Sequence, residues 1–189
     1  MDTAPAKPTP CRLKKTVVMV GMMGAGKTAV GRALAARLQV PFLDSDAEIQ
    51  AAANMTIPEI FARDGEAFFR DKETRVIERL LTENPGVLST GGGAFLAERN
   101  RKAISAKGVS VCLVAELDVL WNRVKHKDTR PLLRSPDPRA TLKGLYEARM
   151  PIYALADLKV VSDGETSIEA MVDRVLSVLA TRPDVLTET

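Results

Sequence analysis

Residues 21–28, with the sequence GMMGAGKT, follow the pattern G-x-x-x-x-G-K-[ST] of a phosphate-binding loop. The motif lies directly after a strand pattern and directly before a helical one, which is the context it requires. Its glycines let successive backbone N–H groups face a phosphate, and the start of the next helix adds positive potential. Lys27 supplies a mobile cation for the β- and γ-phosphates, and Thr28 offers a hydroxyl to Mg²⁺. We therefore predict binding of ATP with Mg²⁺, with the phosphates held by Gly24, Ala25, Gly26, Lys27 and Thr28.

Two carboxylates, Asp44 and Asp46, follow the apolar pair Phe42-Leu43. Ligands of open α/β sheets bind at the carboxyl ends of the strands, so both acids are expected beside the phosphate-binding loop. One acid can hold Mg²⁺, and the other can take the proton of a substrate hydroxyl as its oxygen attacks phosphorus. Beside a phosphate-binding loop, Asp44 is expected to have one of these two roles. The spacing alone leaves a second interpretation of Asp46 open, in which Ser45 or Asp46 only caps the following helix.

Short apolar segments rich in β-formers alternate with helical patterns and must position these residues. The predicted strands are 17–21, 41–44, 86–89, 109–115 and 158–162. Apolar residues recur at helical spacing in 27–39 and 168–179, and in the second of these Ile168, Met171 and Val172 are expected to face the core. Five strands separated by helices imply a parallel sheet with helices on both faces.

The segment from Thr56 carries helix signals of its own. Thr56 and Glu59 have the S/T-x-x-E spacing of a capping box, and Pro58 fits the first turn of a helix. Gly65 is expected to break this helix before a second one over 66–82. Residues 125–139 combine several cations with three prolines and little periodicity, which predicts a mobile basic loop.

Composition limits the remaining choices. The chain has 189 residues, 46% hydrophobic and 27% charged, which is ordinary for a single globular domain and predicts no membrane span. A net charge of +3 without basic, aromatic clusters predicts no nucleic-acid partner. Only Cys11 and Cys112 occur, so neither a disulfide framework nor a zinc cluster is expected. The first residues lack a secretory signal, which favours the cytoplasm. We expect a disordered tail over 1–13, one domain over 14–181 and a flexible tail over 182–189.

The order of the motifs resembles that of the shikimate kinases, from about residue 16 to residue 180. The set comprises the phosphate-binding loop, Asp44-x-Asp46, Gly65-Glu66, Phe69-Arg70, Glu73, Gly91-Gly92-Gly93, Arg130-Pro131-Leu132-Leu133 and Arg149-Met150-Pro151-Ile152-Tyr153. The resemblance implies transfer of the γ-phosphoryl group of ATP to the 3-hydroxyl of shikimate, a step of aromatic amino-acid biosynthesis. It also implies the three-layer P-loop NTPase fold, similar to nucleoside monophosphate kinases, with a five-stranded parallel sheet and a lid over about 125–139.

Several residue roles follow from the same resemblance. On the nucleotide side, Arg123 would flank the adenine and Arg130 would reach the transferring phosphate from the lid. On the acceptor side, Asp46 would bind the shikimate hydroxyls and act as the base, while Arg70 and Arg149 would bind the carboxylate. Gly91, Gly92 and Gly93 would form the wall of the acceptor pocket. Catalysis would therefore rest on Lys27, Asp46 and Arg130, and the metal on Thr28 and Asp44.

Some readings stay open on the sequence alone. Glu73 could orient Arg70 from three residues along a helix or form an ordinary surface pair with it. Residues 162–167 lack the basic or proline-bearing loop that often contacts adenine in this family, so that part of the nucleotide site is unassigned. Two other functions compete: a related kinase of another hydroxy acid such as gluconate, and an inactive nucleotide-binding regulatory module. We expect a monomer.

Overall fold

The structure, a computed structural model, describes residues 11–127 and 131–188. Five parallel strands form its main sheet in the order β3-β4-β2-β5-β6. Their bounds are β2 Thr16–Val20, β3 Phe42–Asp44, β4 Val87–Ser89, β5 Gly108–Val114 and β6 Leu158–Val161. Each lies within about one residue of a predicted strand, so the predicted parallel sheet is confirmed. No helix in the described part of the chain is both long enough and apolar enough to cross a membrane.

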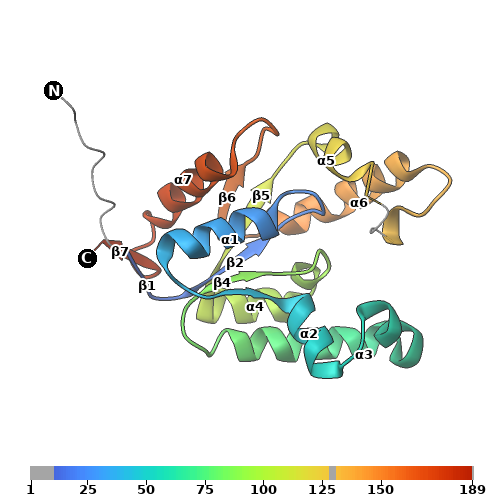
Figure 1. Cartoon of the computed structure of the whole chain (residues 1–189), viewed down its shortest axis with the longest axis horizontal. Coiled ribbons are helices and arrows are strands. Elements are labelled where there is room, and N and C mark those ends of the chain that lie inside the picture. The colour runs from blue at the N-terminus through green and yellow to red at the C-terminus, as the bar shows by residue number, and fades with distance from the viewer. Residues whose placement is uncertain (1–10, 128–130, 189) are drawn as a thin grey trace.

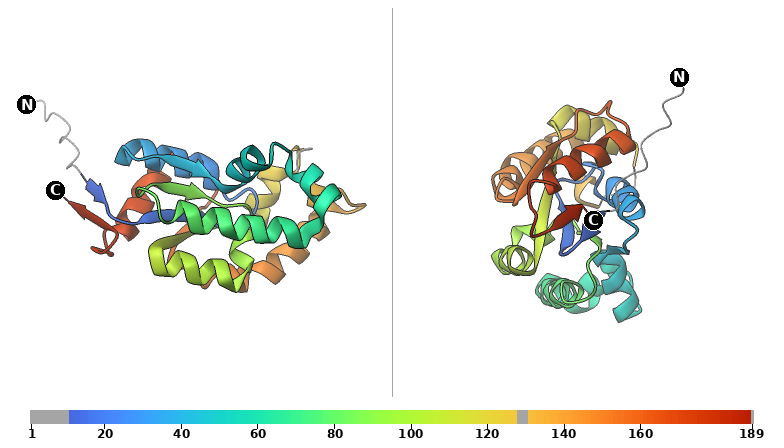
Figure 2. Two further views of the ribbon diagram at one scale, coloured as in Figure 1. Left: turned by 90° about the horizontal axis from the view of Figure 1, so that it is seen from below. Right: turned by 90° about the vertical axis from the view of Figure 1, so that its left-hand side faces the viewer.

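Helices cover both faces of this sheet (Figure 1). They are α1 Lys27–Leu38, α2 Ser45–Ala53, α3 Ile57–Leu80, α4 Glu98–Lys107, α5 Leu117–Val124, α6 Pro138–Tyr153 and α7 Ile168–Leu179, with short 3₁₀ turns η1 Ala94–Leu96 and η2 Pro131–Leu133. Helices α1 and α4 lie on opposite faces of the sheet (Figure 2), and α7 packs beside α1. The predicted three-layer fold is therefore confirmed.

The core lies between these layers because the central strands carry apolar side chains on both faces. All of β2 is buried, and Val17, Val18 and Met19 have no exposed surface. Leu34 of α1 and Val175 of α7 close one side of the sheet, and both are fully buried. A strand buried on both faces must read as a continuous apolar run, which is why this one is visible in the sequence.

Helix α3 begins and bends as predicted. The hydroxyl of Thr56 accepts a hydrogen bond from the Glu59 N–H at 3.3 Å, and Glu59 Oε2 accepts one from the Thr56 N–H at 2.7 Å, which completes the capping box. Gly65 interrupts the helical geometry with φ of 83° and ψ of 172°. The predicted break at Gly65 is therefore confirmed, and the two helical segments that meet there are labelled together as α3. Its second segment carries Arg70 and Glu73.

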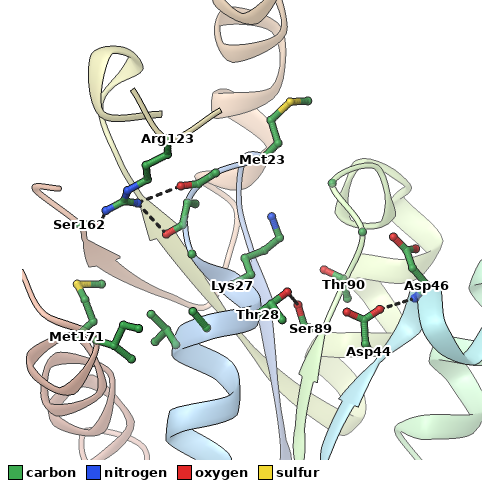
Figure 3. Close-up of a pocket in the computed structure, with 18 of the residues that line it drawn as sticks. Met23, Lys27, Thr28, Asp44, Asp46, Ser89, Thr90, Arg123, Ser162 and Met171 are labelled. Atoms are coloured by element: carbon green, nitrogen blue, oxygen red, sulfur yellow. Dashed lines mark hydrogen bonds between the residues drawn. The ribbon is translucent and has the colours of Figure 1, made fainter. Parts of the chain in front are cut away.

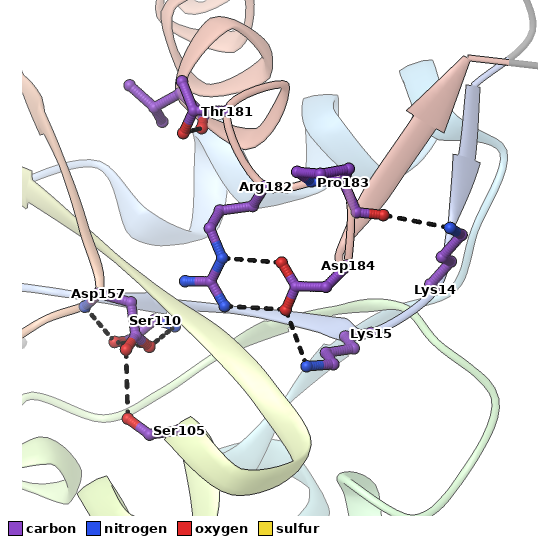
Figure 4. Close-up of polar contacts among 10 residues, drawn as sticks. Lys14, Lys15, Ser105, Ser110, Asp157, Thr181, Arg182, Pro183 and Asp184 are labelled. Atoms are coloured by element: carbon purple, nitrogen blue, oxygen red, sulfur yellow. Dashed lines mark hydrogen bonds and ion pairs between the residues drawn. The ribbon is translucent and has the colours of Figure 1, made fainter.

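The two ends of the described chain differ from the predicted loose tails. β1 Cys11–Leu13 pairs antiparallel with β7 Leu186–Glu188, forming a second, two-stranded sheet. Val185 is fully buried beside it, and Asp184 accepts hydrogen bonds from Lys15 Nζ at 2.9 Å and Arg182 Nε at 2.8 Å (Figure 4). Residues 11–13 and 184–188 are therefore ordered, because a few apolar side chains are buried there and an ion-pair cluster lies at their edge. The predicted tail over residues 1–10 lies outside the described residues.

Candidate active site

The phosphate-binding loop connects β2 to α1 at the carboxyl edge of the sheet. Gly24 and Gly26 have φ values of 80° and 97°, which side-chain-bearing residues rarely adopt. A Cβ on Gly24 would also lie 2.8 Å from Val124 Cγ1 of α5. Lys27 Nζ donates hydrogen bonds to the carbonyls of Gly21 at 2.8 Å and Met22 at 3.0 Å. The lysine therefore lies over its own loop, where a phosphate would enter.

Arg123 of α5 fixes this loop from the opposite side (Figure 3). Its Nη1 donates to the Gly24 carbonyl at 3.0 Å, and its Nη2 donates to Ser162 Oγ at 3.1 Å. The guanidinium thus joins the phosphate-binding loop to the segment after β6. It also lines the same cavity as Lys27. Contact between Arg123 and adenine stays a prediction.

A cavity of about 530 Å³ opens at this edge of the sheet. Its lining includes residues 23–30 together with Asp44, Asp46, Ser89, Thr90, Gly91, Gly92, Arg123, Lys127, Ser162, Thr166, Ile168 and Met171. The last four were not predicted as site residues. Ile168, expected in the core, is 44% exposed and faces this cavity at the start of α7. The available signal was position: these residues directly follow the last parallel strand, at the edge where ligands bind.

Asp44 caps α2, which corrects the alternative that placed the cap at Ser45 or Asp46. Its Oδ1 accepts hydrogen bonds from the N–H groups of Asp46 at 2.9 Å and Ala47 at 3.1 Å. The backbone of Asp44 is still extended, so the helix begins one residue earlier than a cap at Ser45 allows. Its side chain nevertheless lines the cavity. Thr28 lines it too, with its hydroxyl 3.5 Å from Ser89 Oγ.

Asp46 is the second residue of α2 and lies against the glycine-rich segment after β4. A Cβ on Gly91 would be 2.8 Å from Asp46 Oδ1, so only glycine leaves room for the carboxylate. Burial raises the pKa of Asp46, and the nearby Asp44 charge raises it further, whereas Arg70 and Lys27 oppose the rise. The carboxyl group therefore holds a proton more strongly than an exposed aspartate does.

Arg70 pairs with a buried Glu73, so this is not the ordinary surface pair that the spacing also allowed. Arg70 Nη1 lies 2.9 Å from Glu73 Oε1, and the Glu73 side chain is only 1% exposed. Burial raises the pKa of Glu73, while Arg70 opposes this shift. A Cβ on Gly93 would lie 2.5 Å from Arg70 Nη2. The guanidinium is thus fixed between Glu73 and the backbone of Gly93.

Arg149 of α6 approaches the middle glycine of the same segment. A Cβ on Gly92 would lie 3.5 Å from Arg149 Nη1. The three glycines therefore face three of the predicted acceptor-binding side chains, in the order Asp46, Arg149 and Arg70. The structure brings together the predicted residues from four separate segments. Arg130 lies outside the described residues.

Comparison with known proteins leads to the family that the sequence motifs resemble. The family model described as shikimate kinase matches residues 23–180. A shikimate kinase of Ruegeria pomeroyi is 78% identical over 92% of this chain and 89% of its own length. The solved shikimate kinase of Acinetobacter baumannii, in complex with shikimate, has a TM-score of 0.82 and 35% identity, covering 89% of this chain and 94% of its own.

The fold alone is shared more widely. A gluconokinase of Sinorhizobium meliloti has a TM-score of 0.59 and 20% identity, with coverage of 90% of this chain and 94% of its own. The family match over most of the chain and the relative at 78% identity show that this protein belongs to the shikimate kinase family.

Proposed function

We propose that this protein transfers the γ-phosphoryl group of ATP to the 3-hydroxyl of shikimate. One observation carries the assignment: the phosphate-binding loop and Asp46 line a single cavity, and the glycine segment at its far side is flanked by Arg70 and Arg149. A nucleotide phosphate at one end and an anionic polyol at the other would place a hydroxyl oxygen next to phosphorus. Holding two reactants in this way removes much of the entropic barrier to transfer.

The nucleotide is bound mainly through its phosphates. The N–H groups of Gly24, Ala25 and Gly26 face the phosphate oxygens at the start of α1, where the helix dipole favours negative charge. Lys27 leaves the carbonyls of its own loop and pairs with the β- and γ-phosphate oxygens. Its cation then stabilises the charge that develops on the transferring group. The adenine lies between Arg123 and the exposed side chain of Ile168.

The acceptor is held by its carboxylate and activated at its hydroxyl. Arg70 and Arg149 bind the carboxylate, which suits the planar, forked guanidinium group. Asp46 accepts the hydroxyl proton as the oxygen attacks phosphorus, and the bond from phosphorus to the bridging oxygen of ADP breaks. Glu73 keeps the Arg70 guanidinium in place.

The described residues fit a magnesium ion. Thr28 and Asp44 offer oxygen donors in the same cavity, and both hydrogen bonds of the Asp44 cap use Oδ1. No cluster of three or more acidic, cysteine or histidine side chains that could hold a metal occurs within 11–127 and 131–188. This suits Mg²⁺, which commonly binds one or two protein oxygens, water and substrate phosphates. When bound, the ion would neutralise charge on the β- and γ-phosphates.

Arg130 is proposed to act from the lid over residues 125–139, as the family resemblance implies. Its cation would reach the transferring phosphate once nucleotide is bound, and closure of the lid would exclude water as a competing acceptor. We also propose that the enzyme acts as a monomer. Use of ATP and of a metabolite acceptor favours the cytoplasm.

The activity is tested by coupling ADP release to a spectroscopic signal with shikimate, gluconate or no added acceptor. We expect turnover with shikimate only. Turnover with gluconate alone would favour the related kinase, and binding of ATP without any turnover would favour a regulatory module. Nuclear magnetic resonance of the product identifies the phosphorylated hydroxyl.

The variant Lys27→Ala tests whether the activity depends on the lysine of the phosphate-binding loop. We expect kcat to fall by on the order of 10²-fold or more, because one preorganised charge at the transferring group contributes about that much. A thermal melt checks that the variant is folded. Near-normal turnover in the folded variant would contradict the proposed role of Lys27.

A further inference from the structure

Tyr153, the last residue of α6, has no role in the mechanism above although it lies beside the acceptor site. It is 1% exposed, and its hydroxyl donates a hydrogen bond to the Gly92 carbonyl. Its ring stacks on Phe95, with the centroids 6.3 Å apart and the planes inclined by 17°. A buried phenol that donates to the carbonyl of Gly92, the middle glycine of the acceptor wall, can fix the position of that backbone.

The same hydroxyl also meets Arg149, one helical turn earlier on α6. A Cβ built on Gly92 would lie 3.5 Å from Arg149 Nη1 and 3.9 Å from the Tyr153 hydroxyl, so both groups face this glycine. The positive charge of Arg149 opposes the rise that burial causes in the pKa of the phenol. Because burial raises this pKa, the phenol keeps its proton at neutral pH. A phenolic oxygen has one proton to donate and lone pairs to accept with. Tyr153 can therefore donate to Gly92 and accept from Arg149 at once, which no apolar side chain can do.

The turn η1, which directly follows the three glycines, is fixed from another helix. Asn100 Nδ2 of α4 donates to the Ala94 carbonyl at 2.8 Å. Arg101 Nη1 donates to the carbonyls of Phe95 at 2.8 Å and Leu96 at 2.7 Å. These bonds hold η1, which directly follows the glycines. Gly92 lies two residues before η1, and its carbonyl instead accepts a hydrogen bond from Tyr153 of α6.

We propose that Tyr153 is a positioning residue of the acceptor site, whose hydroxyl sets the Arg149 guanidinium relative to the Gly92 backbone and so favours an acceptor that carries a carboxylate. This inference rests on the proposed function, because it assigns the carboxylate of the acceptor to Arg149. The hydroxyl acts through Arg149 and the wall and does not touch the reacting atoms. Its loss should therefore weaken acceptor binding more than it slows the chemical step.

The test is Tyr153→Phe, which keeps the ring and its stacking on Phe95 and removes only the hydroxyl. We expect KM and Kd for shikimate to rise about 10-fold, as for loss of a hydrogen bond to a charged group. The kcat at saturating shikimate and the KM for ATP should stay within about twofold. Tyr146→Phe is the matched control, because this half-buried tyrosine lies on the same helix, and it should leave all four constants unchanged.

A double-mutant cycle with Arg149→Ala distinguishes positioning from general support of the fold. If Tyr153 acts through Arg149, Tyr153→Phe adds little to the loss of shikimate affinity that Arg149→Ala causes alone. Losses that multiply in the double variant, an unchanged shikimate KM in Tyr153→Phe, or equal losses for ATP and shikimate would overturn the proposal. Wild-type turnover with shikimate is measured in the same series. If it is absent, the proposed function fails and this inference fails with it; if it is present, the cycle tests Tyr153 alone.

Discussion

Opposing influences act on the carboxyl group of Asp46. Burial and the negative charge of Asp44 favour its protonated form, while Lys27 and Arg70 favour the ionised form, and the net effect is a raised pKa. A carboxylate with a raised pKa is a stronger base than an exposed one. The environment that suits Asp46 for accepting a proton therefore also makes its charge unfavourable to the folded state.

Asp46→Asn should lower kcat by on the order of 10²–10⁴-fold, the usual contribution of a general base, and leave ATP affinity almost intact. The amide keeps the shape of the side chain but cannot take the hydroxyl proton. Steady-state kinetics and ATP titration measure the two effects separately. A collapse of ATP affinity with kcat preserved would instead place Asp46 in the metal site.

The same substitution should make the folded protein more stable at neutral pH. A pKa raised above the unfolded value of 3.8 means that the folded state binds this proton more tightly. Ionisation of Asp46 therefore costs stability as pH rises from the unfolded pKa through the folded one. Asp46→Asn cannot ionise, so its melting temperature should match the wild type below both pKa values and exceed it above them. The opposite order at neutral pH would show that Lys27 and Arg70 outweigh burial.

Helix α3 shows how an element places a side chain. Its capped first segment and its second segment meet at Gly65, and the second carries Arg70 to Gly93. The φ and ψ values of Gly65 lie in a region that is nearly exclusive to glycine. Since a Cβ at Gly65 would meet no atom within 4 Å, this glycine is required by backbone geometry and not by space.

Gly65→Ala should therefore destabilise the protein by about 1–3 kcal/mol, the usual range for a residue held in such a conformation. Gly144→Ala is the matched control, because that glycine also has no atom near a built Cβ but lies inside α6 with ordinary helical geometry. It should stabilise the protein by about 1 kcal/mol, since alanine favours helix over glycine. Urea denaturation of both variants measures the difference. A neutral or stabilising Gly65→Ala would mean that the kink is easily straightened.

Local rules explain which elements and site residues could be predicted. Strand β2 is buried on both faces and so reads as an apolar run, while the phosphate-binding loop and the Thr56 capping box have fixed spacings. Asp44 as a helix cap depends on where β3 ends, which spacing alone does not fix to one residue. Ile168 matches the apolar period of α7, yet the carboxyl edge of the sheet leaves it over a cavity. The Tyr153 contact joins segments 61 residues apart and has no local signal.

At the scale of the whole molecule, the candidate active site and the terminal strands β1 and β7 lie at opposite ends of the main sheet. The cavity is at the carboxyl ends of the parallel strands, whereas β1 and β7 pair at the end of the molecule away from α5 and α6 (Figure 1). Pairing of three-residue strands from the two chain ends cannot be read from hydrophobic periodicity, because each strand is too short to show a period. It depends on contacts between segments that are far apart in the sequence.

This separation predicts that the terminal sheet supports stability and leaves catalysis unchanged. Val185, next to β7, is fully buried, so Val185→Ala should lower the free energy of unfolding by about 2 kcal/mol, from two lost methyl groups and the cavity they leave. Val161→Ala is the control, because Val161 is 62% exposed and its truncation should change stability by no more than about 0.5 kcal/mol. Both variants should keep the wild-type kcat and KM below their melting temperatures. If Val185→Ala instead lowered kcat in proportion to its stability, the ends of the chain would be coupled to the site through the sheet, and the two ends of the molecule could not be treated as independent.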